Sequence, residues 1–196
     1  MGNQSFDNLT TEKFRVRMRP HAVAIYEQLF PGCTIEDLRE QGVRVHVLDK
    51  HFGIDTLATF ATGQWISIQE KYRTHPYLVN PRLRINPRCP DFTQEYKNAV
   101  GTKYEEVGEW FKLGAQLYFY GWASEDESRF EKWLLMDIAR YKLLVEERGG
   151  LAAIGKMRQN NRHGRASFYC IPINELKPAW IATAKTSGLL PMVVSP

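Results

Sequence analysis

The chain has 196 residues, of which 43% are hydrophobic and 24% are charged, with a formal net charge of +4 and a pI of about 8.9. This length and composition suit one globular domain with a real core and exclude a wholly disordered chain. The three cysteines lie far apart and form no CxxC pair, which argues against a disulfide framework or a zinc ribbon.

The sequence gives no sign of a membrane or secretory segment. No apolar run approaches the ~20 residues that a bilayer-spanning helix needs, and the first residues form no apolar signal region. We therefore expect a cytoplasmic protein without a membrane segment. Residues 1–12 are polar and are expected to be loose.

Two helices are predicted before the first strand. Pro20 suits a first helical turn, and the apolar residues between 22 and 30 gather on one side, which indicates a helix over 20–30. Thr34 resembles a helix cap, with Asp37 three residues later and Gly42 as a stop, which indicates a second, short helix.

A three-stranded meander is predicted next. The valines of 43–47 alternate with polar residues, and 49–53 resembles a turn. A second strand is predicted over 55–61 and a third over 65–73, joined by the turn Thr62-Gly63. In the third strand Gln69 and Lys71 share one face, because side chains alternate along a strand.

The rest of the chain is predicted to mix strands and helices. Residues 74–114 form a loop-rich insertion, with four prolines between 74 and 90 and a short strand at 91–98. The other expected elements are strands at 115–123 and 166–173 and a short helix near 177–184. Residues 130–138 fit either a returning hairpin strand or the start of a helix to Arg148, and we favour a strand to about Asp137 and then a helix that ends at Gly149-Gly150. This order predicts an α/β fold with a central mixed β-sheet flanked by helices.

One group of residues in this meander is a candidate catalytic site. Asp55 opens one strand and Gln69 and Lys71 lie on the next, so that a hairpin brings the three together. Mg²⁺ and similar hard cations prefer oxygen ligands, which the Asp55 carboxylate, the Gln69 amide and the Glu70 peptide carbonyl can supply. Lys71 offers a compact positive charge to a phosphate.

The segments Gly53-Ile54-Asp55 and Ile68-Gln69-Glu70-Lys71 resemble the PD-(D/E)xK superfamily of restriction-endonuclease-like nucleases, in its Q-x-K variant. The resemblance implies a restriction-endonuclease-like fold and Mg²⁺ or Mn²⁺ as the cofactor. It also implies a further glutamate on the preceding helix, a position that Glu27 could occupy. Ile54 stands where the family name has proline.

Two other interpretations remain open at this stage. Asp55 could simply cap a strand while Gln69 and Lys71 face solvent. A second copy of the motif letters, Pro90-Asp91 and then Glu95-Tyr96-Lys97, is too compact to lie on two strands and is interpreted as a supporting or solvated strand. The Glu70 side chain is expected on the opposite face, where it needs a partner if buried.

Three segments, 13–21, 71–90 and 156–165, are basic and free of acidic residues. Such segments favour contacts with phosphates. The acidic residues gather elsewhere, in Glu105, Glu106, Glu109 and residues 125–131. The predicted nucleic-acid-binding residues are Arg73, Arg82, Arg84, Arg88, Arg158, Arg162 and Arg165.

The sequence thus predicts a metal-dependent nuclease that hydrolyses phosphodiester bonds, with DNA as the expected partner and a role in phage, restriction or repair systems. A homodimer is expected if the enzyme cuts both strands. The alternative is a catalytically inactive nucleic-acid-binding or assembly protein on the same fold. No P-loop, GxGxxG, HExxH or GxSxG motif points to another enzyme class.

Overall fold

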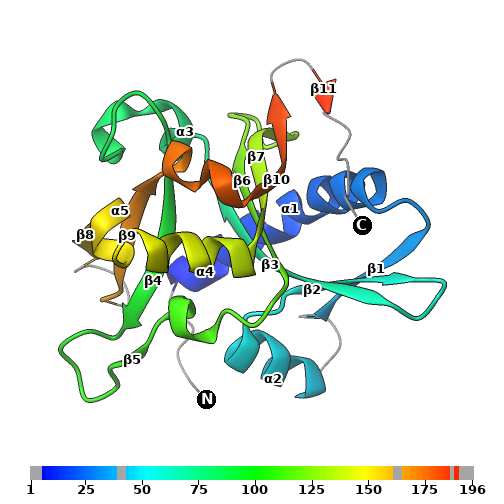
Figure 1. The fold of residues 1–196 in the computed structure, drawn as a ribbon, viewed down its shortest axis with the longest axis horizontal. Helices are drawn as coiled ribbons and strands as arrows, with labels where there is room; N and C mark the ends of the chain where they lie inside the picture. Colours follow the sequence, from blue (N-terminus) through cyan, green and yellow to red (C-terminus); the bar gives the residue numbers. More distant parts are fainter. Residues whose placement is uncertain (1–5, 39–42, 161–164, 186–187, 190–196) are drawn as a thin grey trace.

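Two β-sheets and the helices around them make up the molecule (Figure 1). The computed structural model describes residues 6–38, 43–160, 165–185 and 188–189. The larger sheet has seven strands in the order β1-β2-β3-β6-β7-β10-β11, and the smaller has four in the order β5-β4-β9-β8. In the larger sheet β3 and β6 are parallel and the other pairs are antiparallel. The predicted α/β class with a mixed central sheet is therefore confirmed.

The elements are the strands of the larger sheet, the strands of the smaller sheet and the helices. The strands of the larger sheet are β1 (Cys33–Asp37), β2 (Thr56–Phe60), β3 (Trp65–Arg73), β6 (Leu117–Ala123), β7 (Phe130–Asp137), β10 (Trp180–Lys185) and β11 (Gly188–Leu189). Those of the smaller sheet are β4 (Asp91–Asn98), β5 (Glu106–Val107), β8 (Lys156–Gln159) and β9 (Ser167–Pro172). The helices are α1 (Phe6–Leu29), α2 (Val43–Phe52), α3 (Pro76–Val79), η2 (Pro81–Leu83), η3 (Glu109–Lys112), α4 (Ile138–Glu147), α5 (Leu151–Ile154) and η4 (Ile173–Ala179).

Helix α1 packs on one face of the larger sheet. Its buried residues Phe14, Met18, Ala22 and Tyr26 recur every four positions, which places them in one stripe. They meet Ile68, Phe119 and other inward side chains of the sheet in one apolar cluster. This burial outweighs Pro20, which removes one helical hydrogen bond.

The prediction that residues 1–12 are loose and that the helix starts at Pro20 is therefore wrong for 6–12, where the helix has already begun. Residues 1–5 lie outside the described part of the chain.

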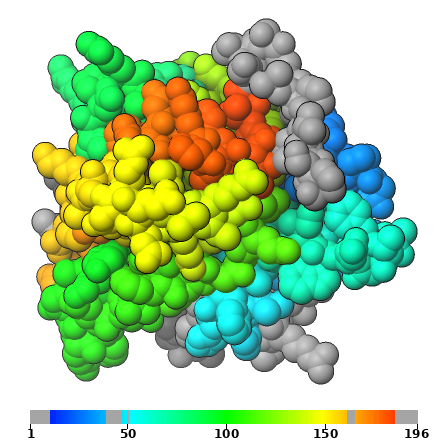
Figure 2. Space-filling view, viewed as in Figure 1, coloured from blue at the N-terminus to red at the C-terminus, as the bar shows by residue number. Residues whose placement is uncertain are grey.

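The opposite face of the larger sheet is covered by α4, η3, η4 and the smaller sheet. Tyr118, Tyr120 and Met136 from the larger sheet pack there with Tyr141 of α4 and Phe92 of β4 in a second, larger apolar cluster. In the space-filling view α4 and α5, in yellow, lie beside η4, in orange, on this side of the molecule (Figure 2). Polar groups on this side of β3 are thus enclosed between two layers.

The segment between α1 and β2 differs from its prediction. The predicted helix from Thr34 is strand β1, which pairs with β2 from Cys33–Phe60 to Asp37–Thr56 and buries part of Ile35 against the α1 cluster. The predicted strand 43–47 is instead the start of helix α2, which continues to Phe52. Five alternating residues are too few to distinguish the period of a helix from that of a strand, which explains the wrong prediction for 43–47. At 33–37, pairing with β2 outweighed the local helix signals.

Most of the later prediction is confirmed. The strand 65–73 coincides with β3, and the Thr62-Gly63 turn is present, with Gly63 at a φ of +81°. Strand β7 leads into α4, and Gly149 and Gly150 follow with positive φ angles. The predicted helix near 177–184 is wrong for 180–184, which belong to β10 beside β7, whereas 177–179 are the end of the 3₁₀ helix η4. The 74–114 insertion includes β4 and β5 of the smaller sheet.

Candidate functional site

The hairpin of β2 and β3 sets the position of Asp55. The register pairs Thr56 with Ile68, so Asp55, one residue before β2, lies opposite Gln69. Residues directly opposite in an antiparallel pair project from the same face. Tyr118 of β6 lies beside Gln69 on its other side. Asp55, Gln69 and Tyr118 therefore form a row across three strands, and Lys71 lies one step further along the same face.

Asp55 is fixed by the neighbouring strand. Its Oδ2 accepts a hydrogen bond of 2.7 Å from the backbone N–H of Glu70, and only 1% of the residue is exposed. The N–H and C=O of one strand residue point to the same side. The Glu70 carbonyl therefore points toward the Asp55 side of β3, which brings the predicted oxygen donors into one region.

The side chain of Gln69 is buried, and its amide oxygen is not hydrogen-bonded to any described residue. It is 6% exposed, and its Oε1 has no hydrogen-bond partner among the described residues. A β-carbon on Gly53 would lie 2.6 Å from this oxygen, and Gly53 has a φ of +57°. The positive φ favours glycine at position 53, and any β-carbon there would displace the Gln69 amide.

Lys71 contacts Glu109, an acidic residue that was predicted to lie away from the candidate site. Its Nζ lies 3.2 Å from Glu109 Oε2 on η3. The same carboxylate accepts hydrogen bonds from Gln94 Nε2 at 3.1 Å and from Tyr118 Oη at 2.8 Å. Burial opposes the charge of Lys71, but Glu109 and Glu95 outweigh it, so the pKa of Lys71 is raised.

Glu109 and Gln94 were not predicted as site residues. Glu109 was grouped with the acidic side of the molecule, and it lies 38 positions from Lys71. No local motif links the two residues. Only the crossover between the parallel strands β3 and β6, which contains β4 and η3, brings them together.

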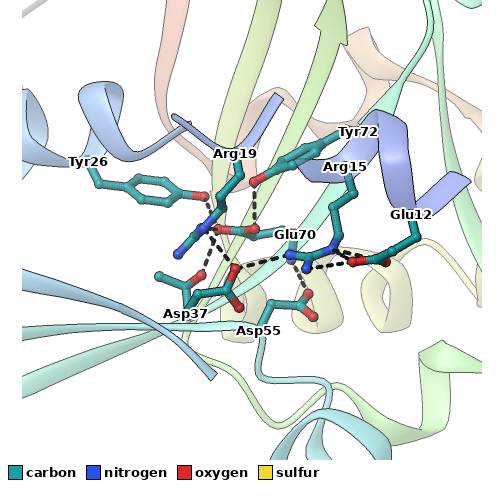
Figure 3. A network of polar contacts seen from close by, with 9 residues as sticks. Glu12, Arg15, Arg19, Tyr26, Asp37, Asp55, Glu70 and Tyr72 are labelled. Atoms are coloured by element: carbon teal, nitrogen blue, oxygen red, sulfur yellow. Dashed lines mark hydrogen bonds and ion pairs between the residues drawn. The ribbon is translucent and has the colours of Figure 1, made fainter. Parts of the chain in front are cut away.

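The Glu70 side chain occupies the other face of β3, as expected, and its partners come from α1 and the neighbouring strands (Figure 3). Arg19 forms an ion pair with Glu70 Oε1, and Tyr26 Oη and Thr56 Oγ1 donate to the same oxygen at 2.9 Å and 2.7 Å. Tyr72 Oη donates to Glu70 Oε2 at 2.6 Å.

The network continues to β1 through a second carboxylate. Asp37 lies 3.1 Å from Arg19 Nε and 3.0 Å from Arg15 Nη1, and Arg15 also pairs with Glu12. Burial disfavours the charged form of Arg19, yet Glu70 and the other nearby oxygens raise the pKa of Arg19. The partner of Glu70 that the sequence left unidentified is therefore Arg19.

Glu27 is not brought to the candidate site. It lies exposed near the end of α1, which packs on the Glu70 face, whereas Gln69 and Lys71 face the other layer. The second set of motif letters makes its direct contacts elsewhere, although the charge of Glu95 helps to raise the pKa of Lys71. Glu95 accepts from Asn98, and Lys97 pairs with the exposed Glu105.

The predicted nucleic-acid-binding arginines fall into two groups. Arg73, Arg84 and Arg158 line one cavity between the two sheets. Arg82, Arg88 and Arg165 lie exposed on connecting segments. Arg162 lies outside the described residues.

Among the described residues, no three His, Cys, Asp or Glu side chains are placed to share a metal ion. The Q-x-K set contains one such acid, Asp55, beside amide and carbonyl oxygens. Within the same part of the chain, no helix is both long and apolar enough to cross a bilayer. No family model matches the chain, and neither does any curated protein or solved structure.

Proposed function

We propose that the chain is a metal-dependent nuclease of the PD-(D/E)xK, restriction-endonuclease-like type, in its Q-x-K variant, and that DNA is its substrate. The meander that follows α1 and carries Asp55, Gln69 and Lys71 on one face supports the proposal. The observation that carries it is Gln69 Oε1, a buried oxygen beside Asp55 and Lys71 that has no hydrogen-bond partner among the described residues. A buried polar atom without a partner is unfavourable and points to a bound group.

The oxygen atoms present suit Mg²⁺ or Mn²⁺. The Asp55 carboxylate, the Gln69 amide oxygen and the Glu70 peptide carbonyl would hold the ion, and Glu109 adds a second carboxylate beside Lys71. These are the hard oxygen donors that such ions prefer, and no softer donor is needed. A bound divalent ion would polarise a phosphodiester and acidify a nearby water molecule.

Lys71 supplies fixed positive charge at this place. Because its pKa is raised, the ammonium stays charged at neutral pH. Its Nζ is held by Glu109, which is held in turn by Tyr118 and Gln94. A lysine positioned in this way can stabilise negative charge that builds up on a phosphate during hydrolysis.

The alternative function is nucleic-acid binding or assembly without catalysis. The burial of Asp55 and Gln69 and the ion pair of Lys71 with Glu109 favour it, because they occupy the groups that catalysis would use. A calorimetric titration with Mn²⁺ separates the two. A binding site that is lost in Asp55→Asn supports the nuclease, and the absence of any binding by the native chain supports the alternative.

The proposed nuclease is tested by cleavage of plasmid and single-stranded DNA in Mg²⁺ or Mn²⁺. Asp55→Asn should remove cutting, because it removes the only carboxylate of the Q-x-K set. Asp137→Asn is the matched control, since Asp137 also accepts one backbone N–H, at 2.9 Å, as the cap of α4, and asparagine caps helices equally well. Equal cutting by native protein and Asp55→Asn would refute the assignment. A cytosolic location and a homodimer stay predictions.

A further inference from the structure

A cavity of about 180 Å³ lies between the end of β3 and the smaller sheet. Its lining residues include three arginines, Arg73, Arg84 and Arg158, and one acidic residue, Asp91. Tyr77 and Thr93 contribute an aromatic ring and a hydroxyl group. Three cationic groups against one anionic group give the cavity a positive charge.

Among the described residues, none of the three arginines forms an ion pair within 4.0 Å with a carboxylate. Arg158 donates to the carbonyls of Leu83 and Arg84 at 3.0 Å and 3.1 Å, and Arg84 donates to Pro87 O at 3.1 Å. The Arg73 guanidinium lies 3.9 Å from the centre of the Tyr77 ring. Within the described part of the chain, Arg84 Nε is buried and has no hydrogen-bond partner.

The arginines of α1 provide the contrast. Arg15, Arg17 and Arg19 each form an ion pair with a carboxylate of this chain. Their charge is neutralised by direct ion pairs, whereas Asp91 is the one carboxylate that the described lining sets against the three cavity arginines, and it interacts with Arg84 and Arg158 at longer range. Arginines that are oriented by carbonyls and a ring keep their remaining N–H groups for an external anion, and planar guanidinium groups suit phosphate well.

Asp91 shapes the cavity and adds an acceptor. Its Oδ2 accepts the backbone N–H of Ile85 at 2.7 Å, which fixes the turn that carries Arg84. Its Oδ1 is buried and has no hydrogen-bond partner among the described residues. A ligand that satisfies the cavity therefore needs an anionic group for the arginines and an O–H or N–H donor for Asp91. A nucleotide unit, with its phosphate, sugar and base, has both.

The cavity continues the face of β3 that carries Lys71. Arg73 lies two residues after Lys71 on the same face, a separation of about 7 Å along a strand. We propose that this cavity binds the phosphate of a nucleotide unit next to the one held at Lys71, so that one nucleic-acid strand contacts both places. The inference rests on the proposed function for the position of the strand.

The test is binding of a fluorescently labelled single-stranded oligonucleotide in EDTA, followed by anisotropy at several salt concentrations. Arg73→Gln should bind about tenfold more weakly, and its salt dependence should fall by about 0.7, the value for one phosphate contact on a single strand. Arg17→Gln is the matched control and should bind as the native chain does. Arg84→Gln is a second variant with the same expected loss, and thermal unfolding checks that both variants are folded.

Inorganic phosphate is the competitor that distinguishes a strand from a free phosphate compound. Weak competition by phosphate, with a large loss in Arg73→Gln, supports binding of a strand. Phosphate binding as tight as oligonucleotide binding would overturn it in favour of a small phosphate compound, and unchanged affinity in both arginine variants would overturn the site altogether. Because EDTA removes divalent ions, this result is independent of cleavage. Loss of binding in Arg73→Gln together with no cutting by the native chain supports the cavity and refutes the nuclease.

Discussion

The two faces of β3 treat their polar residues in opposite ways. On the face toward α1, both oxygens of the Glu70 carboxylate accept hydrogen bonds, and Arg19 neutralises it (Figure 3). On the face toward the smaller sheet, Gln69 Oε1 has no hydrogen-bond partner in the described part of the chain. On that face Arg73 is held only by the Tyr77 ring among the described residues.

The difference distinguishes polar groups that stabilise the fold from polar groups that are available to a ligand. A buried charge must be paired and hydrogen-bonded to be tolerated, and the Glu70 face meets this requirement completely. On the Gln69 face Lys71 is paired with Glu109, but Gln69 Oε1 has no hydrogen-bond partner among the described residues. An unsatisfied buried group is a typical feature of a site that completes its contacts with a bound group. The comparison predicts that substitutions on the first face reduce stability and that those on the second reduce binding.

The largest expected effect is that of Glu70→Ala. It removes one of the two carboxylates that pair with the buried Arg19, and it leaves the buried donors of Tyr26 and Thr56 without their acceptor. The free energy of unfolding should fall by about 3–5 kcal/mol, measured by urea denaturation. Glu127→Ala is the control, because it removes the partner of Arg17, an arginine of the same helix with an exposed side chain, and should change stability little. Similar losses in the two variants would remove the distinction between buried and exposed ion pairs.

A smaller loss of stability is expected at alkaline pH, from the ionisation of buried tyrosines. Burial, and then the Glu70 carboxylate, raises the pKa of Tyr26 and of Tyr72 well above the ordinary value. A raised pKa in the folded state stabilises the protein below the unfolded-state value of about 10, and that contribution is lost as the pH rises above it. Phenolate absorbance should therefore show tyrosines that ionise only as the fold is lost, whereas in denaturant all ionise together. Complete ionisation with the fold intact would contradict this.

The smallest effect on stability is expected for Gln69→Met. The substitution conserves volume and removes a buried amide whose oxygen is unpartnered, so the free energy of unfolding should stay unchanged or rise by up to about 1 kcal/mol. Binding of Mn²⁺ should be lost. Gln94→Met is the control, since the Gln94 Oε1 likewise has no hydrogen-bond partner among the described residues but its Nε2 donates to Glu109. It should be less stable than the native chain, because Glu109 loses this donor. A loss in Gln69→Met as large as that in Glu70→Ala would refute the contrast between the faces.

The sequence predicted the local parts of this arrangement well. The bounds of β3, the turn at Gly63 and the alternation of Gln69, Glu70 and Lys71 all follow from a period of two and from turn chemistry. Strands β4, β6 and β7 were also predicted because their β-forming residues are bounded by clear turn signals.

The parts that depend on distant contacts were missed. Strand β1 is specified by its pairing with β2, and the length of α1 is specified by its stripe against the sheet. Glu109 and Arg19 reach β3 from 38 and 51 positions away. Neither has a local pattern that indicates its partner, because tertiary packing decides which charges meet.

The most direct test of the central claim is cleavage of plasmid and single-stranded DNA by Lys71→Ala in Mg²⁺ or Mn²⁺. Lys97→Ala is the matched control, since Lys97 also lies on a strand and pairs with a glutamate, Glu105, at 2.7 Å. We predict cutting by the native chain and by Lys97→Ala, and a rate at least about 100-fold lower in Lys71→Ala, with Mn²⁺ binding retained. Cutting by Lys71→Ala at the native rate, or no cutting by the native chain with either metal and either substrate, would contradict the account.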